Sequence, residues 1–278
     1  MILTFDAWGL SPGLAPWLFG ASLCACLLYG LAALLGGSRA ALDERRKLGV
    51  AGSCLWAGWL MHALLIVLEL WSVGQSMPRF GFAPALSVTS WLVLGVYGVE
   101  SRLLPLNDSR RALALCALAC VLLAIVFPGE VLPHVAPWAP LHWGLGLASY
   151  GLFGVAVVHA LLLNRAERKL RQKALALHSS GLPLLQLERL TYRFVEAGFA
   201  VLTAALILGW WVMTAWRWDH KAVFSILGWA VFAGLLVGRH VCGWRGLQAT
   251  RWLYVGVLLL LLAYVGSRFV MEVLIHSR

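Results

Sequence analysis

His142 is the histidine of this sequence whose neighbours best suit chemistry, because it begins the apolar stretch LHWGLGLASYG. Gly144, Gly146 and Gly151 make a helix built on this stretch thin enough for a large flat group to approach. Neutral imidazole is a standard axial ligand of haem iron. The pattern suits haem ligation by His142. A lone imidazole in a helix bundle can also be a hydrogen-bonding core residue, and that interpretation stays open.

Four tryptophans form a cluster that is denser than membrane anchoring requires. They are Trp210, Trp211, Trp216 and Trp218, and they run into the short segment WRWDHK. Flat aromatic rings beside a membrane surface can stack on a planar ligand such as a porphyrin, and they can equally hold a hairpin at the interface. Trp216 and Trp218 are therefore candidates for a stacking platform, with anchoring as the alternative.

Two ionisable residues inside apolar runs are further candidates, since such groups are costly in a membrane and are functional there by default. Arg268 lies inside one end of the last apolar run, with Glu272 four residues later. Its guanidinium could hold a haem propionate, because arginine suits two-pronged carboxylate recognition, or it could pair with Glu272 in helix packing. His62 lies within the second apolar run and could form a polar relay with Glu69.

The elements that must position these side chains are membrane-spanning helices. Hydrophobic residues make up 61% of the chain and charged residues 12%, whereas soluble proteins carry roughly 25% charged residues. The chain has continuous apolar runs, each long enough to cross a bilayer as a helix, near residues 14–37, 48–71, 83–100, 112–129, 140–163, 194–215, 221–239 and 250–273. The expected fold is an all-α, polytopic membrane helix bundle with about eight transmembrane helices, forming a single domain over residues 1–278.

The net charge of +10 comes mainly from one side of the predicted bundle. Of the 22 lysines and arginines, 17 fall in connections on the same side as residues 38–48. Because positively charged connections of membrane proteins stay in the cytoplasm, both termini are expected outside. This explanation of the charge also argues against a nucleic-acid partner.

The longest connection, residues 164–193, is a basic elbow on the predicted cytoplasmic side. Its first part, NRAERKLRQKALALHSS, should extend the fifth helix, and LPLLQLERLTYRF should begin the sixth, with Pro183 in its first turn. The elbow could lie against lipid headgroups, or it could dock a cytoplasmic partner.

Several sequence blocks, in this order, resemble the C-terminal half of CcsA-type cytochrome c assembly proteins. They are LHWGLGLASYGLFGVAVVHALLL, LERLTYRFVEAGFAVLTAALILG, WDHKAVFSILGWAVFAGLL and GWRG…LAYVGS. The stretch MHALLIVLEL, which includes His62, resembles the bacterial YpjD/HemX-like inner-membrane subgroup of that family. This extends the similarity over nearly the whole chain.

The resemblance implies a bacterial inner-membrane protein that handles haem for delivery to apocytochrome c, with other assembly proteins as partners. In the family, a tryptophan-rich outer segment ending in W-D-P-K is flanked by two outer histidines, and together they hold the haem. Trp218, Asp219 and Lys221 match this ending, His142 matches the first histidine, and His276 falls within one residue of the second. The tryptophan-rich segment is shorter here than in the family.

The first functional hypothesis is a bundle that binds b-type, non-covalent haem at its outer face and presents it to a partner. The axial metal ligands would be His142 and His276, and the other cofactor-binding residues would be Trp216, Trp218, Asp219, Arg268 and His62. The sequence has no phosphate-binding loop, nucleophile elbow or H-E-x-x-H helix, so the chain is not expected to be an enzyme.

Two alternatives remain. The shortened tryptophan segment favours a family member that binds no haem and acts as a membrane scaffold or regulator. Such a protein would act through the elbow at 164–193, on a haem-synthesis enzyme or a neighbouring transporter. In the other alternative the chain is itself a transporter, with His62 and Glu69 as an intramembrane polar relay.

Overall fold

The computed structural model describes most of the chain. The described residues are 15–36, 44–72, 79–101, 107–131, 137–173, 184–212 and 218–275. Trp216, His276 and the centre of the elbow, 174–183, lie outside the described residues, so the expectations placed on them stay predictions.

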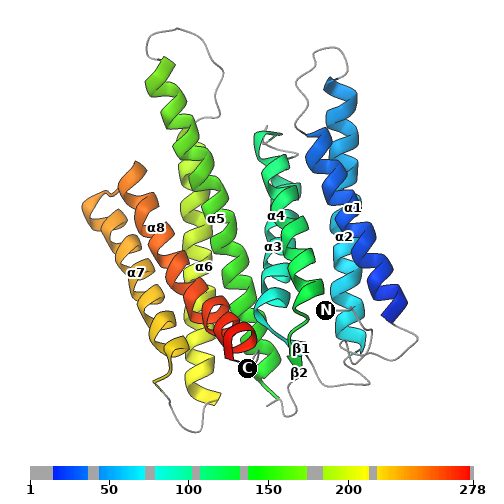
Figure 1. Cartoon of the computed structure of the whole chain (residues 1–278). Coiled ribbons are helices and arrows are strands. Elements are labelled where there is room, and N and C mark those ends of the chain that lie inside the picture. Colours follow the sequence, from blue (N-terminus) through cyan, green and yellow to red (C-terminus); the bar gives the residue numbers. More distant parts are fainter. Residues whose placement is uncertain are drawn as a thin grey trace. The chain divides into compact units, whose positions relative to one another are not determined.

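Eight long helices make up almost all of the described chain (Figure 1). They are α1 (Ala15–Leu35), α2 (Glu44–Ser72), α3 (Phe82–Glu100), α4 (Asn107–Val126), α5 (Ala139–Lys173), α6 (Leu184–Val212), α7 (His220–Cys242) and α8 (Gly246–Leu261). Each begins or contains a stretch of at least 18 residues that is apolar enough to cross a membrane. Lipid cannot satisfy exposed backbone groups, which is why such stretches form helices. The expected all-α, multi-pass membrane fold is confirmed.

The last span does not remain a regular α-helix. After α8 the chain forms the π-helical segment η2 (Leu262–Gly266), the short helix α9 (Ser267–Phe269) and a second π-helical segment η3 (Val270–Ile275). The sequence predicts one helix near 250–273, because hydropathy reports the apolar length and not the hydrogen-bond register. Since π-helical turns occur frequently at functional sites, this departure draws attention to the segment that carries Arg268.

The helices on both sides of the elbow are longer than the predicted spans. α5 continues to Lys173, and α6 begins at Leu184, well before the predicted start of its span near residue 194. Both extensions agree with the helical continuation and restart that the elbow sequence predicts.

The chain divides into two compact units, unit 1 (residues 1–135) and unit 2 (residues 136–278). In unit 1, α1 packs against α2 and α4, and α3 packs against α2 and α4. Two short strands of this unit, β1 (Arg79–Phe80) and β2 (Glu130–Val131), pair antiparallel with Arg79 opposite Val131. The pairing joins the segment before α3 to the segment after α4. The expectation of a single domain over residues 1–278 stays a prediction.

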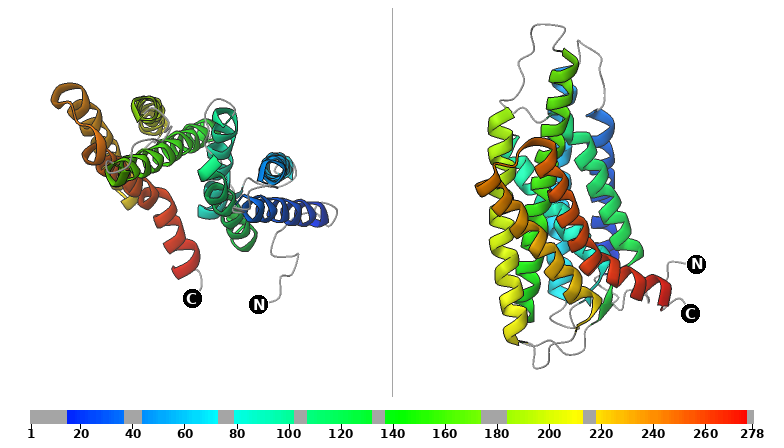
Figure 2. Two further views of the ribbon diagram at one scale, coloured as in Figure 1. Left: turned by 90° about the horizontal axis from the view of Figure 1, so that it is seen from above. Right: turned by 90° about the vertical axis from the view of Figure 1, so that its left-hand side faces the viewer.

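In unit 2, α5 packs against α6 and α8, and α7 packs against α6 and α8 (Figure 2). At the centre of this unit the rings of Phe153 and Phe232 stack with their centroids 3.9 Å apart. Glycines provide the space for both rings: a Cβ at Gly198 would lie 2.9 Å from Phe153, and one at Gly256 would lie 2.8 Å from Phe232. Small residues of this kind let membrane helices approach closely.

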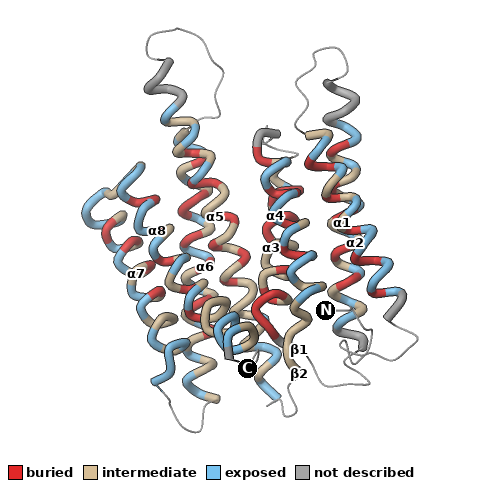
Figure 3. Tube along the Cα trace, viewed as in Figure 1, coloured by how far each residue is buried: buried red, intermediate tan, exposed pale blue. Residues whose placement is uncertain are grey.

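Both units expose apolar side chains on their outer sides, while buried residues follow the contacts between helices (Figure 3). Leu34 and Leu60 in unit 1 and Ile207 and Leu258 in unit 2 each expose more than half of their surface. Apolar surfaces this extensive are unusual for a soluble protein but suit contact with lipid. The burial pattern therefore agrees with the membrane assignment.

Candidate functional site

Several elements meet at one end of unit 2: the beginning of α5, the end of α6, the beginning of α7 and the segment from η2 to α9. They carry interacting polar side chains that we call the His142 cluster: His142, Asp219, Lys221, Tyr264 and Arg268. All five residues belong to unit 2, so the cluster is formed within one compact body.

His142 lies in the first turns of α5, and its Nδ1 atom is 3.0 Å from the backbone oxygen of Ala205 in α6. A carbonyl oxygen only accepts hydrogen bonds, so Nδ1 must carry the hydrogen and donate it. In a neutral imidazole this leaves the lone pair on Nε2. Histidines that bind metals characteristically donate their other ring N–H in this way, which fixes the tautomer and the ring orientation.

Gly209, one helical turn after Ala205, provides the space for the His142 ring. A Cβ at Gly209 would lie 3.0 Å from Cε1 of His142 and 3.4 Å from Nδ1. On α5 itself, a Cβ at Gly144 or Gly146 would meet no atom within 4 Å. Gly144 and Gly146 therefore border open space, whereas Gly151, further along α5, is buried.

Asp219 determines where α7 begins. Its backbone is extended, and its Oδ1 atom accepts a hydrogen bond of 2.8 Å from the backbone N–H of Ala222. This is the geometry of a helix N-cap, which satisfies one of the free N–H groups of the first turn. The cap also places Lys221 in that first turn. The W-D-x-K pattern thus has a local structural basis, in which the aspartate caps the helix that carries the lysine.

Lys221 connects the start of α7 to the π-helical segment. Its Nζ atom lies 5.5 Å from the centroid of the Tyr264 ring, a cation–π contact. Lys221 also interacts electrostatically with His142 and Arg268, and Arg268 interacts with Tyr264. The cluster thus contains two cationic side chains, and the carboxylates of Asp219 and Glu272 also interact with it.

Tyr150 links α5 to the segment that carries Tyr264 and Arg268. Its hydroxyl donates a hydrogen bond to the carbonyl of Leu260, close to the point where α8 gives way to η2. A side-chain donor at a main-chain carbonyl is one of the recognised causes of local departure from α-helical register. The contact helps to hold the π-helical segment against the helix that begins near His142.

The tryptophan candidates and the second histidine candidate are either exposed or outside the described residues. Trp218 is 74% exposed beside Asp219, and Trp210 and Trp211 are also exposed at the end of α6. An exposed indole at the end of a span suits both a stacking platform and a membrane anchor. Trp216 and His276 lie outside the described residues.

His62 belongs to unit 1 and is almost completely buried. Its Nδ1 atom is 3.2 Å from the Tyr29 hydroxyl of α1, and its Nε2 atom is 2.7 Å from the Ser87 hydroxyl of α3. The imidazole therefore bridges three helices with both ring nitrogens engaged. Binding of a metal by His62 would require one of these hydrogen bonds to break, and its role at a cofactor stays a prediction.

The structure adds three residues to the surroundings of His142 that the sequence analysis does not name as site residues. They are Lys221, Tyr264 and Gly209. Lys221 is visible in the match to W-D-x-K, and Tyr264 lies in the LAYVGS block. The Ala205 carbonyl carries no sequence signal, because any residue can supply a main-chain oxygen.

Fold and site together define a multi-pass helical membrane protein with a half-buried histidine held in one tautomer. Comparison with known proteins defines the class more closely. A family model described as "Cytochrome C assembly protein" matches residues 48–275. The chain belongs to the cytochrome c assembly protein family, as its sequence blocks predict.

Individual relatives agree with this membership. The chain is 32% identical over 206 residues to "Inner membrane protein YpjD" of Escherichia coli K12, covering 72% of this chain and 77% of that protein. It is 22% identical over 261 residues to "Cytochrome c biogenesis protein CcsA" of Synechococcus sp. strain CC9605, covering 81% and 86%. The identity to the protein of the same name in Prochlorococcus marinus strain MIT 9313 is 27% over 240 residues, covering 72% and 75%. No solved structure matches the chain.

Proposed function

We propose that this chain is a haem-handling protein of cytochrome c biogenesis that binds non-covalent, b-type haem in unit 2 and presents it at the outer face of the membrane. Membership of the cytochrome c assembly family supports the biological process. The observation that best supports haem binding is the hydrogen bond of 3.0 Å from His142 Nδ1 to the Ala205 carbonyl oxygen. The chain acts as a carrier in this proposal and not as a catalyst.

The chemistry of the side chains in the His142 cluster supports a haem group as the ligand. His142 donates through Nδ1, so Nε2 of the neutral ring retains the lone pair that an iron atom needs. Lys221 and Arg268 supply the positive charge that would hold propionate groups. When bound, the haem would be the cargo that is handed to an apocytochrome, and the chain's own residues would hold and orient it.

Asp219 serves this site indirectly, because its carboxylate caps α7 and so places Lys221. Trp218 would form the exposed wall of the site as a stacking surface. His276 remains the proposed second axial ligand from the sequence resemblance, with Trp216 as the second stacking residue.

The proposal includes an orientation. The charge bias of the connections predicts both termini outside, which puts the beginnings of α5 and α7 on the non-cytoplasmic side. The inner membrane of a bacterium is the proposed location, in line with the name of the E. coli relative. An apocytochrome or another assembly protein would meet the haem there, and membrane lipid surrounds the spans.

An absorption spectrum of the purified full-length protein, as isolated and after haem reconstitution, tests the proposal. Wild type should show a Soret band, His142→Ala should lose most of it, and His240→Ala should retain it. His240 is a suitable control because it is an exposed histidine near the other end of α7. A wild-type protein without a Soret band after reconstitution would support the scaffold alternative, in which charge reversal in the elbow affects activity and His142→Ala does not.

A further inference from the structure

A pocket separate from the His142 cluster opens at the other end of unit 2, where α5 leaves its span and where α6 and α8 begin. Its volume is about 570 Å³, which is within the usual range for small-molecule sites. Four leucines form the apolar part of its lining: Leu163, Leu184, Leu185 and Leu247. The charged part consists of Glu167 from α5, Glu188 from α6 and Arg245 from the segment before α8.

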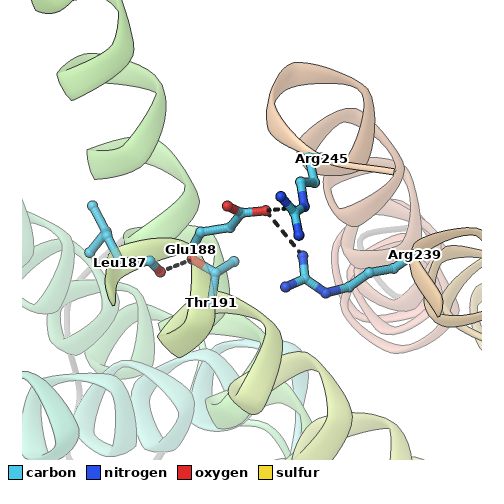
Figure 4. A network of polar contacts seen from close by, with 5 residues as sticks. All are labelled: Leu187, Glu188, Thr191, Arg239 and Arg245. Atoms are coloured by element: carbon cyan, nitrogen blue, oxygen red, sulfur yellow. Dashed lines mark hydrogen bonds and ion pairs between the residues drawn. The ribbon is translucent and has the colours of Figure 1, made fainter. Parts of the chain in front are cut away.

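One of the two carboxylates in this pocket already has partners (Figure 4). Oε1 of Glu188 lies 3.2 Å from Nη1 of Arg239 and 4.0 Å from Nε of Arg245. Arg239 also stacks on the Tyr192 ring, with its guanidinium carbon 3.3 Å from the ring centroid. Glu188 is therefore ion-paired within the protein and joins α6 to the end of α7 and to the segment before α8.

The other charges of the pocket are still available to a ligand. Among the described residues Glu167 forms no ion pair, although its Oε1 atom lies close to the first residue of α8, 3.5 Å from the position of a Cβ on Gly246. Arg245 is exposed, its side chain 73% accessible, and it only shares Glu188 with Arg239. An acidic group and a basic group thus line one pocket without pairing with each other.

The position of the pocket along the membrane-spanning helices indicates whether a ligand would meet hydrocarbon or lipid headgroups. The apolar stretch of α5 ends at Arg168, and those of α6 and α8 begin at Leu184 and Gly246. The pocket is therefore at the level where spans leave the hydrocarbon and meet lipid headgroups. Nearby, Trp244 in the segment before α8 stacks on Trp252 of α8, with ring centroids 6.0 Å apart. Tryptophans at this level are typical of the membrane interface.

We propose that this pocket binds the headgroup of a zwitterionic aminophospholipid, phosphatidylethanolamine in chemical terms. The primary ammonium donates hydrogen bonds to Glu167, the phosphate pairs with Arg245, and the upper parts of the acyl chains lie on the exposed side chains of Leu185 and Leu247. A headgroup with negative charge alone would be repelled by Glu167, and a quaternary choline has no N–H group to donate. The inference is independent of haem binding.

Native mass spectrometry of the detergent-purified, full-length protein tests this proposal with lipids of identical acyl chains. Wild type should retain phosphatidylethanolamine about tenfold better than phosphatidylcholine or phosphatidylglycerol. This factor is the contribution expected from one charge-assisted hydrogen bond. Glu167→Gln should abolish the preference over phosphatidylcholine. Arg245→Gln should weaken both zwitterionic lipids, because both carry the phosphate.

Two exposed residues of unit 2 that do not line the pocket provide matched controls, Glu196→Gln and Arg251→Gln, and both should bind lipid as wild type does. Size-exclusion profiles and unfolding midpoints identify any variant that fails to fold. Equal retention of ethanolamine and choline lipids by wild type would overturn the proposal, as would an unchanged preference in Glu167→Gln. Displacement of the lipid by an equimolar amount of soluble phosphoethanolamine would also overturn it, because the ligand would then be the free compound.

Discussion

Two histidines, one in each unit, differ in the partners of their ring nitrogens. His62 in unit 1 is buried and has a side-chain hydroxyl at each ring nitrogen, Tyr29 on one side and Ser87 on the other. His142 in unit 2 is half-buried, and its Nδ1 is held by a main-chain carbonyl. A carbonyl fixes the tautomer, whereas a hydroxyl can donate or accept and fixes none. The hydrogen bonds therefore select one tautomer at His142 and leave both tautomers open at His62.

Substitution of His62 should produce the largest effect on stability and little effect on haem. His62→Ala removes a buried bridge between α1, α2 and α3 and leaves the hydroxyls of Tyr29 and Ser87 without this partner. The expected loss is about 3 kcal/mol in the free energy of unfolding, from the cavity and the lost hydrogen bonds together.

Unfolding by sodium dodecyl sulfate, followed by circular dichroism, measures this loss. The exposed His240→Ala variant should remain within about 0.5 kcal/mol of wild type. A His62→Ala protein that folds as stably as wild type but loses its Soret band would reverse the roles of the two histidines.

Gly209→Ala should have the converse effect, with haem binding weakened more than stability. The new methyl group would lie 3.0 Å from Cε1 of His142, so the ring would have to shift by a few tenths of an ångström, which disturbs its hydrogen bond to the Ala205 carbonyl. Loss of such a supporting contact typically weakens metal binding by about tenfold or more. Haem titration by absorbance measures the change, and Gly234→Ala is the control because a Cβ there meets no atom within 4 Å. Equal haem affinity in both variants would show that the ring orientation does not matter.

Asp219 should give the smallest effect of the three. Asp219→Ala removes the N-cap of α7 and should cost about 1 kcal/mol, whereas Asp219→Asn should keep the cap and most of the stability. Thermal unfolding of the two variants checks this order. If Asp219→Asn instead lost haem affinity while keeping wild-type stability, the carboxylate would have a direct role at the cofactor and not only a capping role.

Local sequence patterns predict much of this protein. Continuous apolar runs predict the spans, and the elbow sequence predicts the extension of α5 and the early start of α6. Each of these depends on residues close together in the chain. Gly144 and Gly146, which follow His142, likewise indicate the open space beside the first turns of α5.

Contacts between distant residues could not be predicted in this way. The bond from His142 to Ala205 joins positions 63 residues apart, and its acceptor is a main-chain atom that any residue provides. The contact of Lys221 with Tyr264 depends on a π-helical turn, whose register hydropathy does not record. His62 looks like a functional intramembrane residue in the sequence, because its two hydroxyl partners lie on other helices.

Chemical rescue of a His142 variant tests the central claim most directly. His142→Gly in the full-length protein should lose the Soret band of bound haem, and added imidazole should restore it by filling the space of the missing ring beside Ala205. His240→Gly, a substitution at the exposed control histidine, should show neither the loss nor the rescue. A His142→Gly protein that keeps the wild-type haem spectrum without imidazole would contradict the account.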